Sequence, residues 1–553
     1  MIRGAIHAAI KEELISLGAP DVSFVVERPG EMSHGDYASN AALSAAKVLK
    51  RNPREVAEEI AKKLENKIDG IEKIEVAGAG FINFFISHQA LLREVANTQQ
   101  DSWGKNDAYA NKTVMVEYTD PNPFKEFHIG HLMGNAIGES IARLLEWSGA
   151  EVIRANYQGD VGPHVAKAMF VLLEQQIENP TIAQISLAYV EGAKRYEEHS
   201  ADKAAIDALN KKIYDQSDER VNALYKKGRA LSLKHFEELY KILGTKFNLY
   251  FFESESGPKG LEIVKAHPEV FEHSDGATIF RGENYGLHTR VFVNSQGLPT
   301  YEAKELGLIE TKLEKSAFDF SITVTANEIK DYFDVIRKVI ELVFPDLTDK
   351  ILVRFHGFLR LTTGKMSSRK GNVVTGESLL EDLTEEAEAK MRERKLANTD
   401  EIAQQVAVGA IKYAVLKQGA GRDIIFDPER SLSLEGDSGP YLQYAHTRSL
   451  SLLRAANKAG IEASVVDAPA EVGALERMLI HYPEVVERAA KELEPHYVTT
   501  YLTELAAAFN SWYASGRVIG GKHEQYGVLL VQAVEQTLKK GLQVLGIPVP
   551  EEM

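Results

Sequence analysis

The chain has 553 residues, of which 44% are apolar and 26% are charged, and its formal net charge is -16. At about 150 residues per domain, this length predicts roughly three or four domains with sizeable cores. The absence of cysteine excludes disulfides, thiol catalysis and thiolate zinc sites, and the negative charge argues against indiscriminate nucleic-acid binding. No apolar run reaches the roughly 18 residues of a membrane span and the first residues lack the plan of a secretory signal, so we expect a cytoplasmic protein without a membrane partner.

Residues 1–105 are predicted to form a small α+β domain. Ile6, Ile10 and Leu14 recur every four residues, which is the spacing of one face of an amphipathic helix. Further along, the stretch GAGFINFFIS mixes apolar residues with glycines in a pattern typical of a strand. Helix and strand together indicate a unit with its own core.

A larger domain built on a parallel sheet is predicted for residues 106–380. The stretch TVMVEY, a helix with one apolar face and the stretch EVIRANY give a βαβ unit. A second unit consists of FSITVT, a helix over 329–344 and ILVRFHGF. We expect the polar, helix-rich residues from about 165 to 285 to form an insertion between the two halves of a Rossmann-like sheet.

Residues 381–553 are predicted to form an all-α helical bundle. Near the end of the chain, YGVLLVQAVEQTLKKGLQVLGIPVP repeats apolar residues at helical spacing until Pro548 ends the pattern. The expected fold class is therefore multidomain α/β, with a Rossmann-like core, an N-terminal α+β domain and a C-terminal helical domain.

The stretch TDPNPFKEFHIGHLMGN, residues 119–135, lies where the first core strand ends and a helix begins. In open parallel sheets, ligands bind beyond the carboxyl ends of the strands, and a helix start attracts phosphate through its free N–H groups. His128 and His131 can add hydrogen bonds there, and Gly130 lets the backbone approach closely. We predict a triphosphate site. A metal site would need a third ligand that the sequence does not reveal, and a purely structural role for the pair stays open.

A second stretch, TTGKMSSRKGNVVT, follows the last predicted strand of the sheet and carries Lys365, Arg369 and Lys370 among glycines and serines. Mobile cations can close over a leaving pyrophosphate and stabilise charge that develops only in the transition state. Taken alone, a basic loop of this composition is more often simply solvated. Its position on the same sheet as the two histidines favours the catalytic interpretation.

His128-Ile-Gly-His131 and Lys365-Met-Ser-Ser-Arg-Lys-Gly371 resemble the two sequence motifs of class I aminoacyl-tRNA synthetases, and their surroundings resemble the arginyl-tRNA synthetases. Three further stretches are similar to that family. SHGDYASNAA resembles its N-terminal tRNA-binding domain, NYQGDVG its catalytic core, and GRDIIFDPERSLSLEGDSGPYLQYAHTRSLSLLRAA its helical anticodon-binding domain. The order and spacing of these stretches extend the resemblance over nearly the whole chain.

The resemblance implies an arginine–tRNA ligase, which forms arginyl-adenylate from L-arginine and ATP and transfers arginine to the 3′ end of tRNA(Arg). The residues expected to stabilise the departing pyrophosphate, with Mg2+ on the triphosphate, are Lys125, His128, His131, Lys365, Ser367, Ser368, Arg369 and Lys370. Those expected to bind ATP are Gly130, Asn135, His356, Gly357, Phe358 and Met366. Ser368 stands where most class I enzymes have a second lysine, and the resemblance assigns that role to Lys125.

Arginine recognition needs carboxylates and neutral acceptors, because a guanidinium offers five donors and no acceptor. The resemblance assigns Glu117 and Asn122 to the amino and carboxylate groups of arginine, and Tyr301 and Glu305 to its side chain. Asn327 or Glu328 is expected to supply a further acceptor. Tyr301 and Glu305 are four residues apart on a predicted helix and therefore share a face. Glu305 departs from the family's usual Asp, while Met133 and His164 stand where Arg and Gln are common.

Contacts with tRNA are expected from both ends of the chain. The residues concerned are Tyr37, Asn40, Tyr441, Tyr444 and Trp512, whose aromatic members could stack on bases. In a helical bundle, such aromatics are more often part of the core. The resemblance also implies that activation waits for bound tRNA, and we expect a monomer. The alternatives are a class I synthetase for another amino acid, a catalytically idle tRNA-binding or scaffold relative and, less well fitting, a nucleotidylyltransferase.

Overall fold

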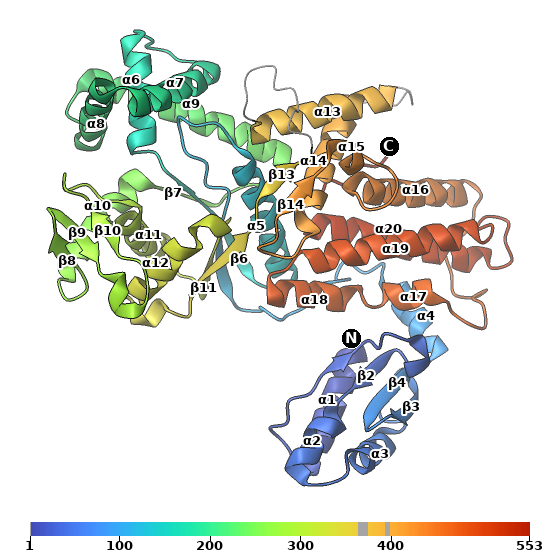
Figure 1. Cartoon of the computed structure of the whole chain (residues 1–553). Helices are drawn as coiled ribbons and strands as arrows, with labels where there is room; N and C mark the ends of the chain where they lie inside the picture. Colours follow the sequence, from blue (N-terminus) through green and yellow to red (C-terminus); the bar gives the residue numbers. More distant parts are fainter. Residues whose placement is uncertain (1, 363–373, 393–398) are drawn as a thin grey trace. The chain divides into compact units, whose positions relative to one another are not determined.

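The computed structural model describes residues 2–362, 374–392 and 399–553 (Figure 1). The chain packs into two compact units. Unit 1 consists of Met1–Gly104, Ala445–Val485 and Tyr501–Lys540, and unit 2 of Lys105–Tyr444, Val486–Thr500 and Gly541–Met553. The helical region after residue 380 thus contributes to both units, and the domain boundaries drawn from the sequence stay predictions.

Unit 1 contains an antiparallel sheet of strand order β1-β2-β4-β3. Ile6, Ile10 and Leu14 of the first helix lie buried in one core with side chains of the sheet and of α2, α3 and α4, which confirms the predicted amphipathic helix. The elements of this part are α1 Ile2–Ser16, β1 Val26–Glu27, η1 Met32–His34, β2 Tyr37–Ser39, α2 Ala41–Leu49, α3 Pro53–Leu64, β3 Ile71–Ala77, β4 Phe81–Ile86 and α4 His88–Asn97.

Unit 2 is built on a five-stranded sheet of order β12-β11-β5-β6-β7, in which all neighbouring strands are parallel. Its strands are β5 Thr113–Glu117, β6 Glu151–Gln158, β7 Leu249–Phe252, β11 Phe320–Ala326 and β12 Ile351–His356. The chain leaves β5 toward β6 and later returns to the other side of β5 with β11. The predicted Rossmann-like sheet is confirmed, and its topological switch point lies between β5 and β11, where such sheets bind ligands.

The connections between these strands are mainly helical, and α6 to α9 gather beside one another in Figure 1. The helices of these connections are α5 Ile129–Trp147, α6 Pro163–Glu174, α7 Ile182–Glu198, α8 Ser200–Asp215, α9 Glu219–Leu243, α10 Glu253–Ala266, η2 Gly282–Tyr285, α11 Tyr301–Lys315, η3 Asn327–Ile329, α12 Lys330–Val343 and η4 Pro345–Leu347. The insertion differs from the expected helical stretch, because β7 joins the main sheet. In addition, β8 Glu272–Ser274, β9 Ala277–Phe280 and β10 Arg290–Val293 form a small antiparallel sheet.

After β12 the chain is mostly helical, as predicted, with one exception. Strand β13 Leu359–Leu361 pairs in parallel with β14 Ile424–Phe426, which lies where only helices were expected. The helices are α13 Gly376–Arg392, α14 Thr399–Leu416, α15 Pro428–Ser431, α16 Gly439–Lys458, α17 Ala474–Leu479, α18 Tyr482–Glu492, α19 His496–Ala514 and α20 Glu524–Val544. Helices α13 and α14 share the core of α5 and the sheet. Among the described residues, no helix is both long and apolar enough to cross a bilayer.

Candidate active site

The loop that follows β5 has an unusual backbone conformation. Thr119 and Asp120 have positive φ angles of 80° and 47°, which few residues other than glycine adopt. Side chains fix the loop from both sides: the Tyr157 N–H donates to Asp120 Oδ1 at 2.7 Å, and Asn135 Nδ2 donates to Thr119 Oγ1 at 3.1 Å. Backbone strain that is held in this way is typical of functional sites.

His128 and His131 lie together at the start of α5. Their rings stack with centroids 3.4 Å apart, and the His128 N–H donates to Nδ1 of His131 at 3.1 Å. Because Nδ1 accepts that bond, the ring proton of a neutral His131 is on Nε2. The helix start therefore presents an imidazole donor beside its free N–H groups, as the sequence suggested for a phosphate site.

Both histidine rings are neutral near pH 7, because their pKa values are lowered. Burial, followed by the charges of His128 and Lys125, lowers the pKa of His131 well below its usual value. Part of the His128 side chain reaches solvent, yet the protein around it and the Lys125 ammonium lower its pKa to about 4. The Lys125 Nζ itself lies 5.3 Å from the centre of the Tyr189 ring of α7.

The carboxyl ends of β5 and β11 and the face of α11 enclose a cluster of acidic groups. Glu117 is 2% exposed, accepts a hydrogen bond from Thr323 Oγ1 at 3.1 Å and pairs with Lys312 Nζ at 2.9 Å. Lys312, which is buried on α11, was not predicted. It follows Tyr301 by eleven residues, or three helical turns, so helical spacing could have placed it on the face of Tyr301 and Glu305.

The acidic cluster carries more negative than positive charge. Burial and the charge of Glu117 raise the pKa of Glu305 to about 8, although Lys312 opposes the shift. The same two causes raise the pKa of Asp120 well above its usual value. The neighbouring Glu253 is already paired with Lys304 at 2.5 Å. A cationic ligand would relieve this imbalance, as expected for an arginine pocket.

The other residues assigned to arginine lie in the loop after β5, at the start of α11 and directly after β11. Asn122 Oδ1 accepts a hydrogen bond from the Gly159 N–H at 2.8 Å, which fixes the loop after β5 to the end of β6. Tyr301 is 58% exposed and precedes Glu305 by one turn of α11. Glu328 is exposed in η3, directly after β11. All of them lie at the carboxyl edge of the sheet.

The residues assigned to ATP fall into different environments. His356 ends β12, and a side chain at Gly357 would meet the Arg422 carbonyl oxygen at 2.3 Å, so that position needs glycine. Phe358 is partly exposed, and its N–H donates to Asp423 Oδ1 at 3.0 Å. Asn135 is fully buried. Its amide bonds to Thr119 and to Thr245, so it supports the loop after β5 rather than reaching a nucleotide.

The predicted cationic loop lies outside the described residues, together with its Lys365, Met366, Ser367, Ser368, Arg369 and Lys370. The chain that follows it is described and lies beside the histidines. Thr375 forms a β-bridge with His128, and the Gly376 N–H donates to the Phe127 carbonyl oxygen at 2.8 Å. Thr375 and Gly376 therefore lie next to the start of α5.

Met133 and His164, the two residues near the histidines that differ from those common in the family, both lie buried. Met133 is buried in the core that α5 shares with the sheet. His164 is buried at the start of α6, where its Nε2 lies 2.7 Å from the Gly159 carbonyl oxygen. Burial and the nearby Lys125 lower the pKa of His164 to about 3, so the ring is neutral.

Of the five residues assigned to tRNA, Tyr37 is buried and the other four are half-buried. Tyr37 is 2% exposed and its hydroxyl donates to Glu484 at 2.5 Å, so the expectation that its ring contacts RNA is corrected: it joins two segments of unit 1. Asn40 Oδ1 accepts from the Val25 N–H at 2.9 Å. Tyr441 and Tyr444 are half-buried on α16, and Trp512 is half-buried against Phe509 of α19. The role of these four in binding tRNA stays a prediction.

Comparison with known proteins agrees with this geometry. The family described as "tRNA synthetases class I (R), catalytic domain" matches residues 94–428. "Arginyl tRNA synthetase N terminal domain" matches 4–86, and "DALR anticodon binding domain" matches 442–553.

Individual relatives span the whole length. Proteins named arginine–tRNA ligase from Clostridium perfringens and Clostridium acetobutylicum are 31% and 29% identical, over 98% and 96% of both chains. The solved arginyl-tRNA synthetase of Thermus thermophilus is 28% identical, with a TM-score of 0.83 over 100% of both chains. The chain therefore belongs to the arginyl-tRNA synthetases, a family of class I aminoacyl-tRNA synthetases.

Proposed function

We propose that this arginine–tRNA ligase forms arginyl-adenylate at the carboxyl edge of the sheet, between β5 and β11, and then transfers arginine to the 3′ end of tRNA(Arg). The observation that carries the proposal is the bridge between Thr375 and His128 at the start of α5, the helix that follows β5. It puts the chain that leaves the second motif beside the first motif. One cleft can then serve a nucleotide's phosphates and a cationic amino acid.

In the first step the arginine carboxylate attacks the α-phosphate of ATP, and pyrophosphate leaves. The start of α5, the neutral His128 and His131 and the Lys125 ammonium supply donors for the charge that develops on the pyrophosphate. The predicted cations at 365–370 would add to them. No protein nucleophile is required, because this chemistry depends on positioning and charge stabilisation.

A magnesium ion would be held mainly by the phosphates. Within residues 2–362, 374–392 and 399–553, no three His, Asp or Glu side chains converge as a group that could hold a metal ion. Mg2+ commonly binds through phosphate oxygens and keeps several waters, so the absence of a protein cage fits its role with ATP. When bound, it would neutralise part of the triphosphate charge.

Selectivity for arginine follows from the acidic cluster. The guanidinium carries five donors and a fixed positive charge, whereas burial and the charge of Glu117 raise the pKa values of Glu305 and Asp120. Binding of arginine would supply a cation. Glu117 contributes through its charge, since its buried carboxylate is occupied by Lys312.

Transfer to tRNA completes the reaction: the terminal ribose hydroxyl attacks the adenylate carbonyl and AMP leaves. We propose a cytoplasmic monomer that activates arginine only with tRNA bound. Pyrophosphate exchange into ATP tests this dependence. Exchange that is equally fast with and without tRNA(Arg) would rule it out, while leaving the ligase activity itself in place.

A charging assay tests the function. The purified protein is incubated with ATP, bulk tRNA and each of the twenty amino acids in turn, and acid-precipitable aminoacyl-tRNA is measured. We expect charging with arginine alone, on tRNA(Arg). Charging with a different amino acid would indicate another class I synthetase, and no charging with any would indicate an idle relative.

A further inference from the structure

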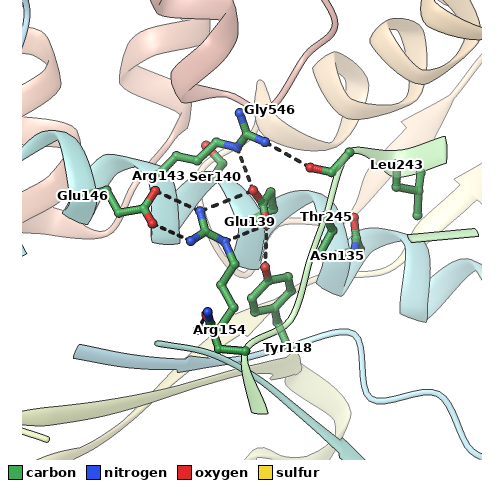
Figure 2. Close-up of polar contacts among 12 residues, drawn as sticks. Tyr118, Asn135, Glu139, Ser140, Arg143, Glu146, Arg154, Leu243, Thr245 and Gly546 are labelled. Carbon is green, nitrogen blue, oxygen red and sulfur yellow. Dashed lines mark hydrogen bonds and ion pairs between the residues drawn. The ribbon is translucent and has the colours of Figure 1, made fainter. Parts of the chain in front are cut away.

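A ridge of polar side chains runs along α5 away from the proposed phosphate site. His131, Asn135, Glu139 and Arg143 follow one another at intervals of four residues, and side chains at that spacing share one face of a helix. Asn135 holds Thr119 of the strained loop. Figure 2 shows how Glu139 and Arg143, two turns further, meet other parts of unit 2.

Glu139 is the centre of a buried ionic network. Its side chain is 2% exposed, and it accepts hydrogen bonds from the Tyr118 hydroxyl at 2.5 Å, Arg143 Nε at 2.7 Å and Arg154 Nε at 3.2 Å. Burial favours the protonated form, but Arg143 and Arg154 outweigh it and lower the pKa of Glu139. The carboxylate is therefore ionised, and Arg154 also pairs with Glu146 at 2.5 Å.

Arg143 and Lys412 hold two backbone segments against α5. Arg143 donates to the carbonyl oxygens of Gln543 and Gly244, both at 3.0 Å. Lys412, buried on α14, donates to those of Gly546 and Leu243, both at 2.7 Å. The end of α20 and the turn after α9 are thus fixed by the same pair of side chains.

A continuous polar path leads from there back to the site. The turn after α9 continues into Thr245, whose hydroxyl donates to Asn135 Oδ1 at 3.2 Å. Asn135 in turn donates to Thr119, which precedes Asp120 of the acidic cluster. Every step is a hydrogen bond or one peptide link, and every residue belongs to unit 2.

We propose that Glu139 is a positioning residue for arginine activation, which acts by fixing Arg143 and, through the turn after α9 and Asn135, the loop that carries Asp120. Segment Gly541–Met553 then contributes to positioning the residues that activate arginine, in addition to belonging to the helical tail. The inference rests on the proposed function, since it assumes that the acidic cluster binds arginine. A network that served stability alone would be replaceable by apolar packing.

The test compares variants in aminoacylation kinetics, each well below its melting temperature. Glu139→Gln and Arg143→Met weaken the network, and we expect each to raise KM for arginine about tenfold or more, because small displacements at a distance misplace reacting groups. KM for tRNA should stay within about twofold. The matched control is Glu146→Gln, which touches Arg154 from a side chain that is 39% exposed and should leave both constants unchanged.

Thr245→Val keeps the test decisive if the charged variants do not fold. It removes the hydroxyl bond to Asn135 without altering any charge, and we expect a raised KM for arginine with a melting temperature lowered by only a few degrees. Wild-type KM for arginine in this variant, or in folded Glu139→Gln, would overturn the proposal and leave the network a stabilising feature. A wild-type protein that forms no arginyl-tRNA would instead refute the proposed function.

Discussion

Two groups of charged residues in unit 2 differ in how their charges are paired: the network around Glu139 in the middle of α5, and the acidic cluster that contains Glu305 of α11. In the middle, Glu139 is surrounded by Arg143, Arg154 and the Tyr118 hydroxyl, and its pKa falls. In the acidic cluster, the pKa of Glu305 rises to about 8 because burial and Glu117 outweigh Lys312. The carboxylate of Glu139 is fully paired with cations of the protein, whereas the acidic cluster has fewer cations than carboxyl groups and can bind a cationic ligand.

This difference separates residues that stabilise α5 from residues that bind substrate. A buried charge with protein partners is costly to disrupt, while a buried charge without enough partners is a group prepared for binding. Mutations in the middle of α5 should therefore act on stability and geometry, and mutations around its start on substrate. The following expectations test that division, from the largest effect to the smallest.

Replacing Glu139 with alanine should lower the free energy of unfolding by about 3–5 kcal/mol, because two partly buried guanidinium groups lose their buried carboxylate. Replacing Glu146, which is more exposed, should cost at most about 1 kcal/mol. Urea unfolding of both variants measures the two losses in the free energy of unfolding. Equal losses would contradict the view that the network is centred on Glu139.

Replacing Glu305 with glutamine should lower kcat/KM for arginine by an amount that corresponds to about 2–5 kcal/mol of transition-state stabilisation, because a buried partner of the guanidinium is lost. Glu314→Gln is the matched control, since this glutamate lies on the same helix with a side chain that is 55% exposed. Stability should not fall. A loss that appears in KM for ATP but not for arginine would place Glu305 outside the arginine pocket.

Replacing His128 with asparagine should slow formation of arginyl-adenylate about a hundredfold, the usual cost of losing one donor to a developing charge. Single-turnover measurements with tRNA present give this rate, and KM for arginine should change little. His267→Asn, at a surface position, serves as the control. An unchanged rate would remove His128 from the reaction.

The pH dependence provides the smallest and most specific effect. Below pH 8 the free Glu305 carboxyl is protonated, and it must lose its proton before it can pair with a guanidinium. We therefore expect kcat/KM for arginine to rise about tenfold per pH unit until it levels off near pH 8. Glu305→Gln should lose this limb. A flat profile from about pH 6 upward in the wild type would contradict the raised pKa.

Local patterns predicted the parts of the fold and of the site that depend on local order. The βαβ units, the histidines at a helix start and the shared face of Tyr301 and Glu305 all follow from spacing within one element. Lys312 has the same kind of signal, three turns along α11, and could have been predicted. Short strands such as β7 carry too few residues for a periodic pattern.

Residues defined by distant packing could not be predicted in this way. Tyr37 was expected to contact RNA, but Glu484, which buries its hydroxyl, is 447 residues further along the chain. Asn135 was expected to contact ATP, but its partners Thr119 and Thr245 lie in loops on either side of α5. Polar side chains of this kind look alike in sequence whether they face a ligand or a buried partner.

The most direct test of the central claim is a crystal structure with a non-hydrolysable arginyl-adenylate analogue and tRNA(Arg). We expect the guanidinium to lie within hydrogen-bond distance of Glu305, and the phosphate mimic to lie at the start of α5 beside His128 and His131. An analogue bound with its guanidinium away from the acidic cluster, or its phosphate mimic away from α5, would contradict the account.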